Sequence, residues 1–388
     1  MIFLRPGSRT QRTSRVAPLL SLLLSLGACA GGDAAGAAGA ERLANDSTAP
    51  TTDPGAGAHT PIDSGTGAGG GSLLRDAATL DAASTAADAT RAHESDEARA
   101  TSDAGGADAG GPPIPFGCPG GSITAGMNSL TVGGKARTFY ADLPSDPSKP
   151  MGVLFSWHGF NDSLTHHRQI AGLDPNANPA LPVVVITPDD TGLPPPTGLD
   201  WDIGRGARNE NPDLLFFEAM LGCLHAQLPI DSARIYSFGF SAGSVMSSLL
   251  HSVYPELISA VVAASGGWFN DPAQAKLVNW LTVKWGWPAL DPHQQGAVLL
   301  THGGPSDVAV FSVFDLEKAA EAAFPFLRAH NRVVIDCAHD RGHALHPEVT
   351  GSVVSRFISA HRAGTPSPYR SGGYAAADYP SSCQLRLP

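Results

Sequence analysis

Arg234–Ser248 reads RIYSFGFSAGSVMSS, and this stretch decides the fold of the chain. The apolar, aromatic run at residues 235–238 is typical of a buried strand. It leads into GFSAG at residues 239–243, and apolar residues at helical spacing follow from Val245 onward. Strand, G-x-S-x-G and helix in this order form a nucleophile elbow, in which a sharp turn exposes the serine. The pattern predicts that Ser241 is a nucleophile.

The two glycines have a steric role in such a turn. The chain reverses between strand and helix, so side chains at positions 239 and 243 would collide across it. A chain with 44 glycines can also contain G-x-S-x-G by chance. An acid and a histidine at later strand ends would decide between these interpretations.

Both partners are present, in the required order. Apolar strands are expected at 258–264, 297–300 and 332–336; Asp307 follows the second of them and His343 follows the third. Serine, acid and histidine at strand ends, in this order along the chain, is the order found in α/β hydrolases. His343 would take the Ser241 proton as general base, and Asp307 would orient the imidazole.

Other residues near His343 are alternatives for these two roles. His339 is a second candidate base, and Asp336 and Asp340 are candidate acids. We favour His343 because Gly342 precedes it, which suits an exposed loop position. The alternative acids lie too near the histidine in sequence to approach it from a separate strand end.

The same run, HDRGH at residues 339–343, imitates the H-E-x-x-H zinc motif. Here aspartate replaces glutamate, glycine weakens any helix, and a strand leads in. No clear third ligand is spaced for zinc. We therefore predict no metal and no organic cofactor, because a serine triad with oxyanion donors needs neither.

The other half of the expected site lies at the end of an earlier strand. GVLFSW at residues 152–157 reads as a buried strand that runs into His158, Gly159 and Phe160. An HG pair at this position supplies part of the oxyanion hole, so we expect the N–H groups of Phe160 and Ala242 to donate there. We expect His158 itself to be a structural hydrogen-bonding residue.

Tryptophans outside the strand pattern are candidates for substrate contacts. Trp201 follows a loop rich in Pro and Gly, and Trp268 opens a segment with further tryptophans up to residue 287. Aromatic surfaces of this kind suit apolar or carbohydrate ligands. We predict that Trp201 and Trp268 bind substrate, with a lid at 268–287 or plain core packing as alternatives.

The first 112 residues differ in composition from the rest. Residues 1–29 combine four arginines with a short apolar run and end in LGAC at Cys29, which resembles the bacterial lipobox. We predict a lipoprotein signal peptide, lipidation of Cys29 and anchoring of the exported protein to a membrane; an ordinary secretory signal is the alternative. Residues 30–112 are poor in apolar side chains and are predicted to be a disordered tether. Residues 113–388 form the predicted catalytic domain.

Charge and cysteine content limit the partners and the compartment. The net charge of -11 and the absence of a concentrated basic patch argue against nucleic acid as a partner. Besides Cys29, the chain has four cysteines: Cys118, Cys223, Cys337 and Cys383. An even number in an exported chain predicts two disulfides. Three pairings are open, and buried free thiols are the alternative.

Four motifs together resemble one group of enzymes. HGF at His158, GFSAG at 239–243, HGGPSD ending at Asp307 and GH at His343 followed by Pro347 are similar to the secreted polyhydroxybutyrate depolymerase and feruloyl/acetylxylan esterase families. The resemblance covers most of residues 118–362. It implies the α/β-hydrolase fold, with a mostly parallel eight-stranded sheet flanked by helices, and ester hydrolysis through an acyl-enzyme.

The sequence therefore predicts an exported, lipid-anchored serine esterase. The expected substrates are polymeric or aryl esters: hydroxyalkanoate polyesters, or feruloyl and acetyl groups on polysaccharide. A serine peptidase on the same fold usually carries a large additional domain, for which this chain has no room. A non-catalytic surface lipoprotein is a third hypothesis, and the intact order of Ser241, Asp307 and His343 argues against it.

Overall fold

The computed structural model describes residues 110–191, 200–277, 285–309 and 314–388. The predicted signal peptide, its Cys29 and nearly all of the predicted tether lie outside these ranges. Within them, no helix has the length and apolar character needed to cross a membrane.

The strands at the centre of the fold come from continuous apolar runs. β3 (Met151–Trp157), β4 (Val183–Pro188), β6 (Ile258–Ala264) and β7 (Gly296–His302) are buried along their whole length. β5 (Ile230–Phe240), which ends in the elbow, is buried except at its last residue. Such strands are typical of a parallel sheet that is covered on both faces.

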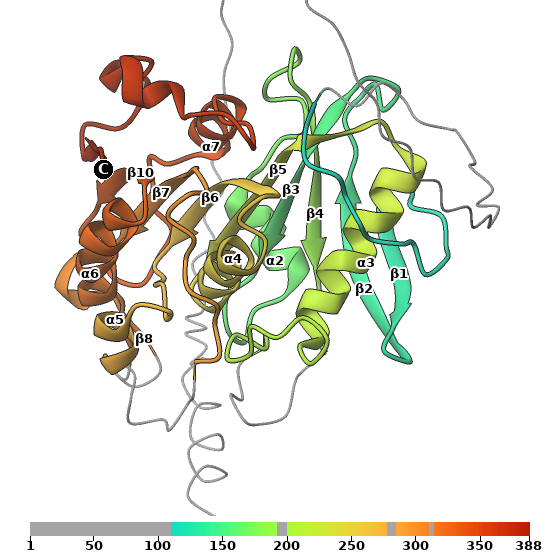
Figure 1. Ribbon diagram of the computed structural model, residues 1–388, viewed down its shortest axis with the longest axis horizontal. Helices are drawn as coiled ribbons and strands as arrows, with labels where there is room; N and C mark the ends of the chain where they lie inside the picture. Colours follow the sequence, from blue (N-terminus) through green and yellow to red (C-terminus); the bar gives the residue numbers. More distant parts are fainter. Residues whose placement is uncertain (1–109, 192–199, 278–284, 310–313) are drawn as a thin grey trace, which may run out of the picture. The chain divides into compact units, whose positions relative to one another are not determined.

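These strands belong to a sheet that has nine members in the described part of the chain (Figure 1). The others are β1 (Gly126–Val132), β2 (Lys135–Asp142), β10 (Arg332–Ala338) and β11 (Cys383–Arg386). The strand order is β1-β2-β4-β3-β5-β6-β7-β10-β11. From β4 to β10 the neighbours run parallel, whereas β1, β2 and β11 pair antiparallel at the two edges.

The predicted arrangement is confirmed, but the sheet has one strand more than the eight expected. The additional strand, β11, has four residues, and only its first is buried. So short a segment carries too little periodicity to be recognised in the sequence. Its place is marked instead by Cys383, which lies opposite Cys337 of β10 and forms a disulfide with it.

The second disulfide joins Cys118 to Cys223, so the prediction of two disulfides is confirmed and one of the three open pairings is selected. Cys223 lies on α3 (Pro212–Gln227), and the bond therefore ties the first described segment to a helix of the main fold. The two cysteines are 105 residues apart in sequence. Closing a loop of this length contributes roughly 4–5 kcal/mol in the chain-entropy model.

Helices cover both faces of the sheet (Figure 1). α3, α4 (Ala242–Val253) and α6 (Leu316–Ala329) supply buried side chains to one apolar core, and α7 (Gly351–Ser359) supplies them to a second. Alternate residues of β5 divide between the two cores, with Ile235 in the first and Tyr236 in the second. The remaining elements are α2 (Leu164–Ala171), α5 (Pro272–Lys276), β8 (Val308–Ala309), β9 (Phe314–Asp315) and the 3-10 helices η2 (Gly304–Ser306), η3 (Pro368–Ser371) and η4 (Ala376–Asp378).

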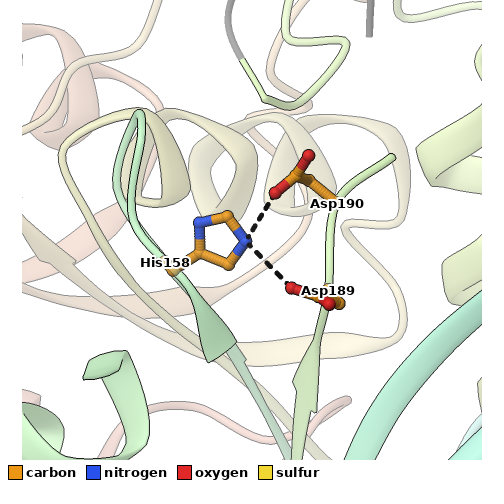
Figure 2. Close-up of side chains that lie close together, drawn as sticks. All are labelled: His158, Asp189 and Asp190. Carbon is orange, nitrogen blue, oxygen red and sulfur yellow. Dashed lines mark ion pairs between the residues drawn. The ribbon is translucent and has the colours of Figure 1, made fainter. Parts of the chain in front are cut away.

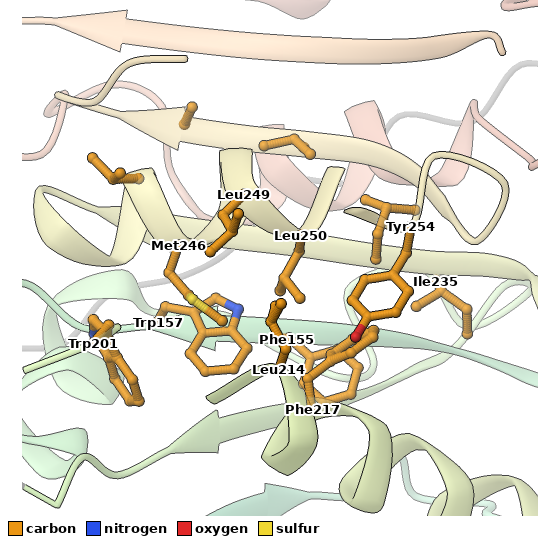
Figure 3. Close-up of a cluster of buried hydrophobic side chains, with 14 of the residues drawn as sticks. Phe155, Trp157, Trp201, Leu214, Phe217, Ile235, Met246, Leu249, Leu250 and Tyr254 are labelled. Carbon is orange, nitrogen blue, oxygen red and sulfur yellow. The ribbon is translucent and has the colours of Figure 1, made fainter. Parts of the chain in front are cut away.

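The first core fixes α4, the helix that follows Ser241. Met246, Leu249 and Leu250 of α4 are fully buried and share this core with Phe155 and Trp157 of β3 (Figure 3). Each fully buried apolar side chain of this size contributes about 1.5–3 kcal/mol relative to an exposed one. The turn between β5 and α4 is therefore held between two well-packed elements.

Candidate active site

Ser241 occupies a strained backbone position between β5 and α4. Its φ of 57° and ψ of -121° lie in a backbone region that residues other than glycine rarely adopt. The Ser241 N–H donates to the carbonyl of Ala264 in β6, at 2.9 Å, and its own carbonyl accepts from Val245, at 3.1 Å. Strain of this kind costs about 1–3 kcal/mol and occurs preferentially at functional sites.

Two glycines allow the chain to pass through this turn. A Cβ atom on Gly239 would overlap the backbone of Gly243, as the sequence analysis expected. A Cβ atom on Gly243 would instead overlap the carbonyl oxygens of Trp157 and His158. Gly243 therefore allows the elbow to lie against the end of β3, just before Phe160.

The structure brings Ser241, His343 and Asp307 together in series. Ser241 Oγ lies 2.9 Å from His343 Nε2, and His343 Nδ1 lies 2.8 Å from Asp307 Oδ1. Asp307 is fully buried, and its Oδ2 accepts from the Ser265 hydroxyl at 2.8 Å and from the Gly303 N–H at 2.9 Å. The carboxylate thus has three hydrogen-bond donors around it, an arrangement that fixes its orientation.

Gly342 also allows the loop that carries His343 to pack against the loop that carries Asp307. Its φ is +64°, and its N–H donates to the carbonyl of Gly303 at 3.0 Å. A Cβ atom on Gly303 would overlap the carbonyl of Gly342. These glycines bring the loops that carry Asp307 and His343 into direct contact.

The alternative base and acids lie elsewhere. His339 accepts from the N–H of Arg341 at 3.2 Å, and burial lowers the pKa of its imidazole. Asp340 is exposed. Asp336 binds His302, with 3.0 Å between Oδ1 and Nε2. The HDRGH run lies between β10 and α7 and is not helical, so it lacks the geometry of the zinc motif.

A buried charged group that the sequence analysis missed supports the Asp307 loop. His302 lies between Asp336 and Glu317, with its Nδ1 2.5 Å from Glu317 Oε2. The same Glu317 oxygen accepts from the Gly304 N–H at 2.9 Å. Burial alone would lower the pKa of His302, but hydrogen bonds to the two carboxylates hold that pKa above its usual value.

The predicted oxyanion donors lie on both sides of the elbow. Ala242 is the first residue of α4, and the first N–H groups of a helix have no partner within the helix. Phe160 follows the end of β3, which is close to the elbow because a Cβ atom on Gly159 would lie 3.3 Å from the Ser241 Cβ. Phe160, Ser241 and Ala242 share a small pocket whose other lining residues are Ile203, Val245, Ala309, Phe314 and Leu316. This pocket is almost entirely apolar.

Comparisons with known proteins address the fold and the class of relatives. No family model matches the sequence. Over 141 residues, 36% of this chain, it is 30% identical to Feruloyl esterase D of Neurospora crassa; the match spans about half of that relative, 48% of its length. Solved structures match a larger part of the chain. The match to the native form of a protein called sOPH covers 70% of this chain and 97% of the sOPH chain, with 20% identity and a TM-score of 0.54. A complex of a pOPH variant with pNPB covers the same shares, with 21% identity and a TM-score of 0.55.

This chain has the α/β-hydrolase fold. The resemblance to esterases that the four motifs indicated is confirmed by the match to Feruloyl esterase D. The similarity to solved structures, at 20–21% identity, supports the fold alone.

A larger groove lies beside His343. Its volume is about 590 Å³. Phe240 and His343 form part of its wall, and their rings stack with centroids 4.9 Å apart. The other lining residues are Ile170, Ala171, Gly172, Phe238, Ala344, Leu345, His346, Pro347, Val349, Thr350 and Gly351. The triad therefore has a small apolar pocket at the serine and a roomier groove at the histidine.

The prediction that Trp201 and Trp268 bind substrate was wrong, because both side chains are fully buried. Trp201 Nε1 donates to the carbonyl of His158 at 2.9 Å, and its ring packs edge-on against Trp157 at 5.0 Å. Trp201 thus holds the backbone that leads from β3 to Phe160. Part of the predicted lid, residues 278–284, lies outside the described residues, and Trp285 stacks on Phe269 at 4.1 Å.

Proposed function

We propose that this chain is an exported serine esterase that hydrolyses carboxylic esters through an acyl-enzyme on Ser241. The observation that carries the proposal is the series of hydrogen bonds from Ser241 through His343 to Asp307 at a strained elbow. The similarity to Feruloyl esterase D supports the same class of reaction. That match spans about half of the relative, so the proposed activity rests on the geometry at Ser241 and not on the relative alone.

The reaction follows from the roles of the three side chains. His343 Nε2 takes the proton as Ser241 Oγ attacks the ester carbonyl carbon, and Asp307 stabilises the imidazolium through Nδ1. The bond to the alcohol oxygen then breaks, and His343 returns the proton to that oxygen. Water, activated by the same histidine, hydrolyses the acyl group from Ser241 and regenerates the enzyme.

The oxyanion that forms during each attack needs preorganised donors. We assign this role to the N–H groups of Phe160 and Ala242, which line the small pocket together with Ser241. The positive end of the α4 dipole adds to the effect. Donors of this kind each contribute about 2.7–4 kcal/mol to transition-state stabilisation.

The two hollows beside the triad bear on the substrate class. An ester with one small apolar part and one larger part suits the small pocket at Ser241 and the groove at His343. In an acetyl ester of polysaccharide, the acetyl group would occupy the small pocket and the polysaccharide would lie in the groove. Feruloyl esters of polysaccharide and chains of hydroxyalkanoate polyester have a larger acyl part, which would lie in the groove.

Export has support within the described residues. Two disulfides, Cys118–Cys223 and Cys337–Cys383, are typical of an oxidising compartment. We propose that the first 29 residues direct export, that Cys29 is lipidated and that residues 30–112 tether the catalytic domain to a membrane. Metabolic labelling with a palmitate analogue tests the anchor, because the Cys29→Ser variant should lose the label that the natural chain acquires.

The activity is tested by hydrolysis of p-nitrophenyl butyrate with the purified, oxidised chain. The Ser241→Ala variant should lose activity by on the order of 10⁴-fold or more, because the nucleophile is removed. Labelling by a fluorophosphonate should disappear with it. Absence of both hydrolysis and labelling in the natural chain would favour a non-catalytic binding protein, and equal activity in both proteins would mean that Ser241 is not the nucleophile.

A further inference from the structure

A buried histidine faces two carboxylates where two neighbouring strands end. His158 follows β3, and Asp189 and Asp190 follow β4 (Figure 2). His158 Nε2 lies 3.4 Å from Asp190 Oδ2 and 4.0 Å from Asp189 Oδ1. One nitrogen or oxygen atom of each residue lies within 4.8 Å of the other two. The triad and its hydrogen-bond partners do not use this cluster.

The hydrogen bond on the other side of the ring settles which nitrogen carries a proton. His158 Nδ1 lies 2.9 Å from the carbonyl oxygen of Gly159, which can only accept, so Nδ1 must donate. The His158 side chain is fully buried, and among the described residues Nε2 has no hydrogen-bond partner. In a neutral imidazole, the lone pair of Nε2 would then face two carboxylate oxygens. That arrangement is repulsive unless a cation lies between them.

The distances favour a metal ion over a proton as that cation. A proton on Nε2 would draw a carboxylate oxygen to about 2.7–2.9 Å, the usual length of a charge-assisted hydrogen bond. Both observed separations are longer. Zinc binds nitrogen and oxygen ligands at about 2.0–2.2 Å, which places tetrahedral ligands roughly 3.3–3.6 Å from one another. The separation of 3.4 Å between His158 and Asp190 lies in this range, and the Asp189 oxygen, at 4.0 Å, would have to move toward the ion. A ligating histidine also commonly donates its second N–H to a backbone carbonyl, as His158 does to Gly159.

We propose that His158, Asp189 and Asp190 bind one divalent transition-metal ion of the zinc type. One imidazole nitrogen and two carboxylates suit such an ion, whereas calcium takes six to eight oxygen ligands. Asp189 is 35% exposed and Asp190 19% exposed, so solvent reaches the carboxylate side of the cluster. Water from that side supplies the fourth ligand.

A metal ion at this site would hold residues 158–160 in place, and Phe160 is the proposed oxyanion donor. This consequence rests on the proposed function. His158 lies two residues before Phe160, and the next N–H, that of Asn161, donates to Asp200 Oδ2 at 2.5 Å. A metal ion at His158 would join the ends of β3 and β4 immediately before the Phe160 donor. Metal binding should therefore stabilise the fold whether or not the chain hydrolyses esters.

The test is zinc binding by the full chain after removal of metal with a chelator. Zinc is titrated in competition with a chromogenic chelator, and cobalt replaces it in a parallel sample to report the ligand field by visible absorption. We expect one tight equivalent, a rise in Tm on binding, and a cobalt spectrum of low coordination number. Asp189→Asn and Asp190→Asn should each weaken zinc binding by about 100-fold or more, since even outer partners of a metal site are worth 10–100-fold.

Two controls isolate the cluster. Asp378→Asn removes an exposed carboxylate near the C-terminus and should leave the tight equivalent unchanged. Ser241→Ala should also bind zinc normally, so failure of the esterase proposal and failure of this one are distinguishable. Equal affinity in Asp190→Asn and the natural chain would place the zinc on surface histidines and overturn the proposal. Absence of a tight equivalent, or preference for calcium, would overturn it as well.

Discussion

Ser241 and Ser156 each make a 2.9 Å hydrogen bond to Nε2 of a histidine, His343 and His167 respectively. The two contacts have the same length, but their surroundings differ. His343 Nδ1 is bound to Asp307, whereas His167 Nδ1 has no hydrogen-bond partner among the described residues. His343 is 24% exposed beside a groove, and Ser156 and His167 are buried between β3 and α2.

This comparison shows what a serine–histidine contact needs in order to become a catalytic pair. A carboxylate must hold the imidazole in one tautomer and stabilise its cation. The serine must also reach substrate, which Ser241 achieves through a strained turn at the end of its strand. Ser156 lies within β3, and its buried hydroxyl faces His167 of α2, where it satisfies a ring nitrogen.

Apart from removal of the nucleophile itself, the largest loss of activity should come from removing the Asp307 charge, which distinguishes the two pairs. Asp307→Asn keeps the size of the side chain but removes the carboxylate that accepts from His343 Nδ1. We expect kcat on p-nitrophenyl butyrate to fall by about 10³–10⁴-fold, because the imidazole loses its orienting partner and the support of its cation. Thermal unfolding provides the control, since a folded but inactive variant is required. Activity within tenfold of the natural chain would show that another acid serves His343.

The buried pair of Ser156 and His167 should make the free energy of unfolding depend on pH. Burial lowers the pKa of His167 from 6.5 to about 3. The unfolded chain therefore binds a proton between these values that the folded chain does not. The His167 contribution to stability is complete above about pH 6.5 and falls by up to about 1.4 kcal/mol for each pH unit below it. Urea unfolding of the natural chain and His167→Gln from pH 7 to pH 4 measures the difference.

The contribution of His302 to stability should change with pH in the opposite direction to that of His167. Its pKa is raised in the folded state, so its contribution to stability is complete below the unfolded pKa and is lost as the pH rises through the folded one. In His302→Gln, the stability loss relative to the natural chain should therefore be greatest at acidic pH. In His167→Gln, the stability gap to the natural chain should narrow on acidification. The same trend in both variants would contradict the assignment.

Local pattern was sufficient to predict the centre of the site. The elbow is a contiguous motif, and its strain, its glycines and its helix follow from steric requirements within a few residues. Asp307 and His343 were predictable because parallel strands deliver their carboxyl ends to one edge of the sheet. The order of chain elements then limits which side chains can meet there.

Residues whose role depends on long-range packing were not predictable in the same way. Trp201 has the composition of a ligand-binding residue, but its burial depends on how the loop before α3 folds back over His158. Ser265 donates to Asp307 from the end of β6, and a serine there carries no signal of its own. Asp189 and Asp190 become neighbours of His158 only because β4 lies beside β3 in the sheet.

Ser156→Ala tests whether the buried pair is structural. The variant leaves His167 Nε2 without its hydroxyl partner in a fully buried site, which should cost about 1–3 kcal/mol of unfolding free energy. Activity at 25 °C should stay within a few-fold of the natural chain. Urea unfolding and p-nitrophenyl butyrate hydrolysis on the same sample give both numbers. A loss of activity as deep as that of Ser241→Ala would contradict the distinction between the two pairs.

A smaller loss of activity than at Asp307 is expected at Ser265, which positions the acid without touching substrate. Its hydroxyl is one of the donors that hold Asp307, so Ser265→Ala removes one hydrogen bond while His343 and Gly303 still bind the carboxylate. One hydrogen bond to a charged group is worth about 1.5–3 kcal/mol, and the two remaining contacts should retain most of the orientation. We expect kcat to fall by roughly tenfold with KM nearly unchanged, because the loss concerns proton transfer and not binding. Ser265 has a φ of 50°, at which a β-branched residue would be strained, so the matched backbone control is Ser265→Gly. Ser265→Gly also lacks the hydroxyl and should lose as much of kcat as Ser265→Ala. If Ser265→Gly keeps the kcat of the natural chain, or if KM rises in place of the fall in kcat, Ser265 supports the loop backbone and does not orient Asp307.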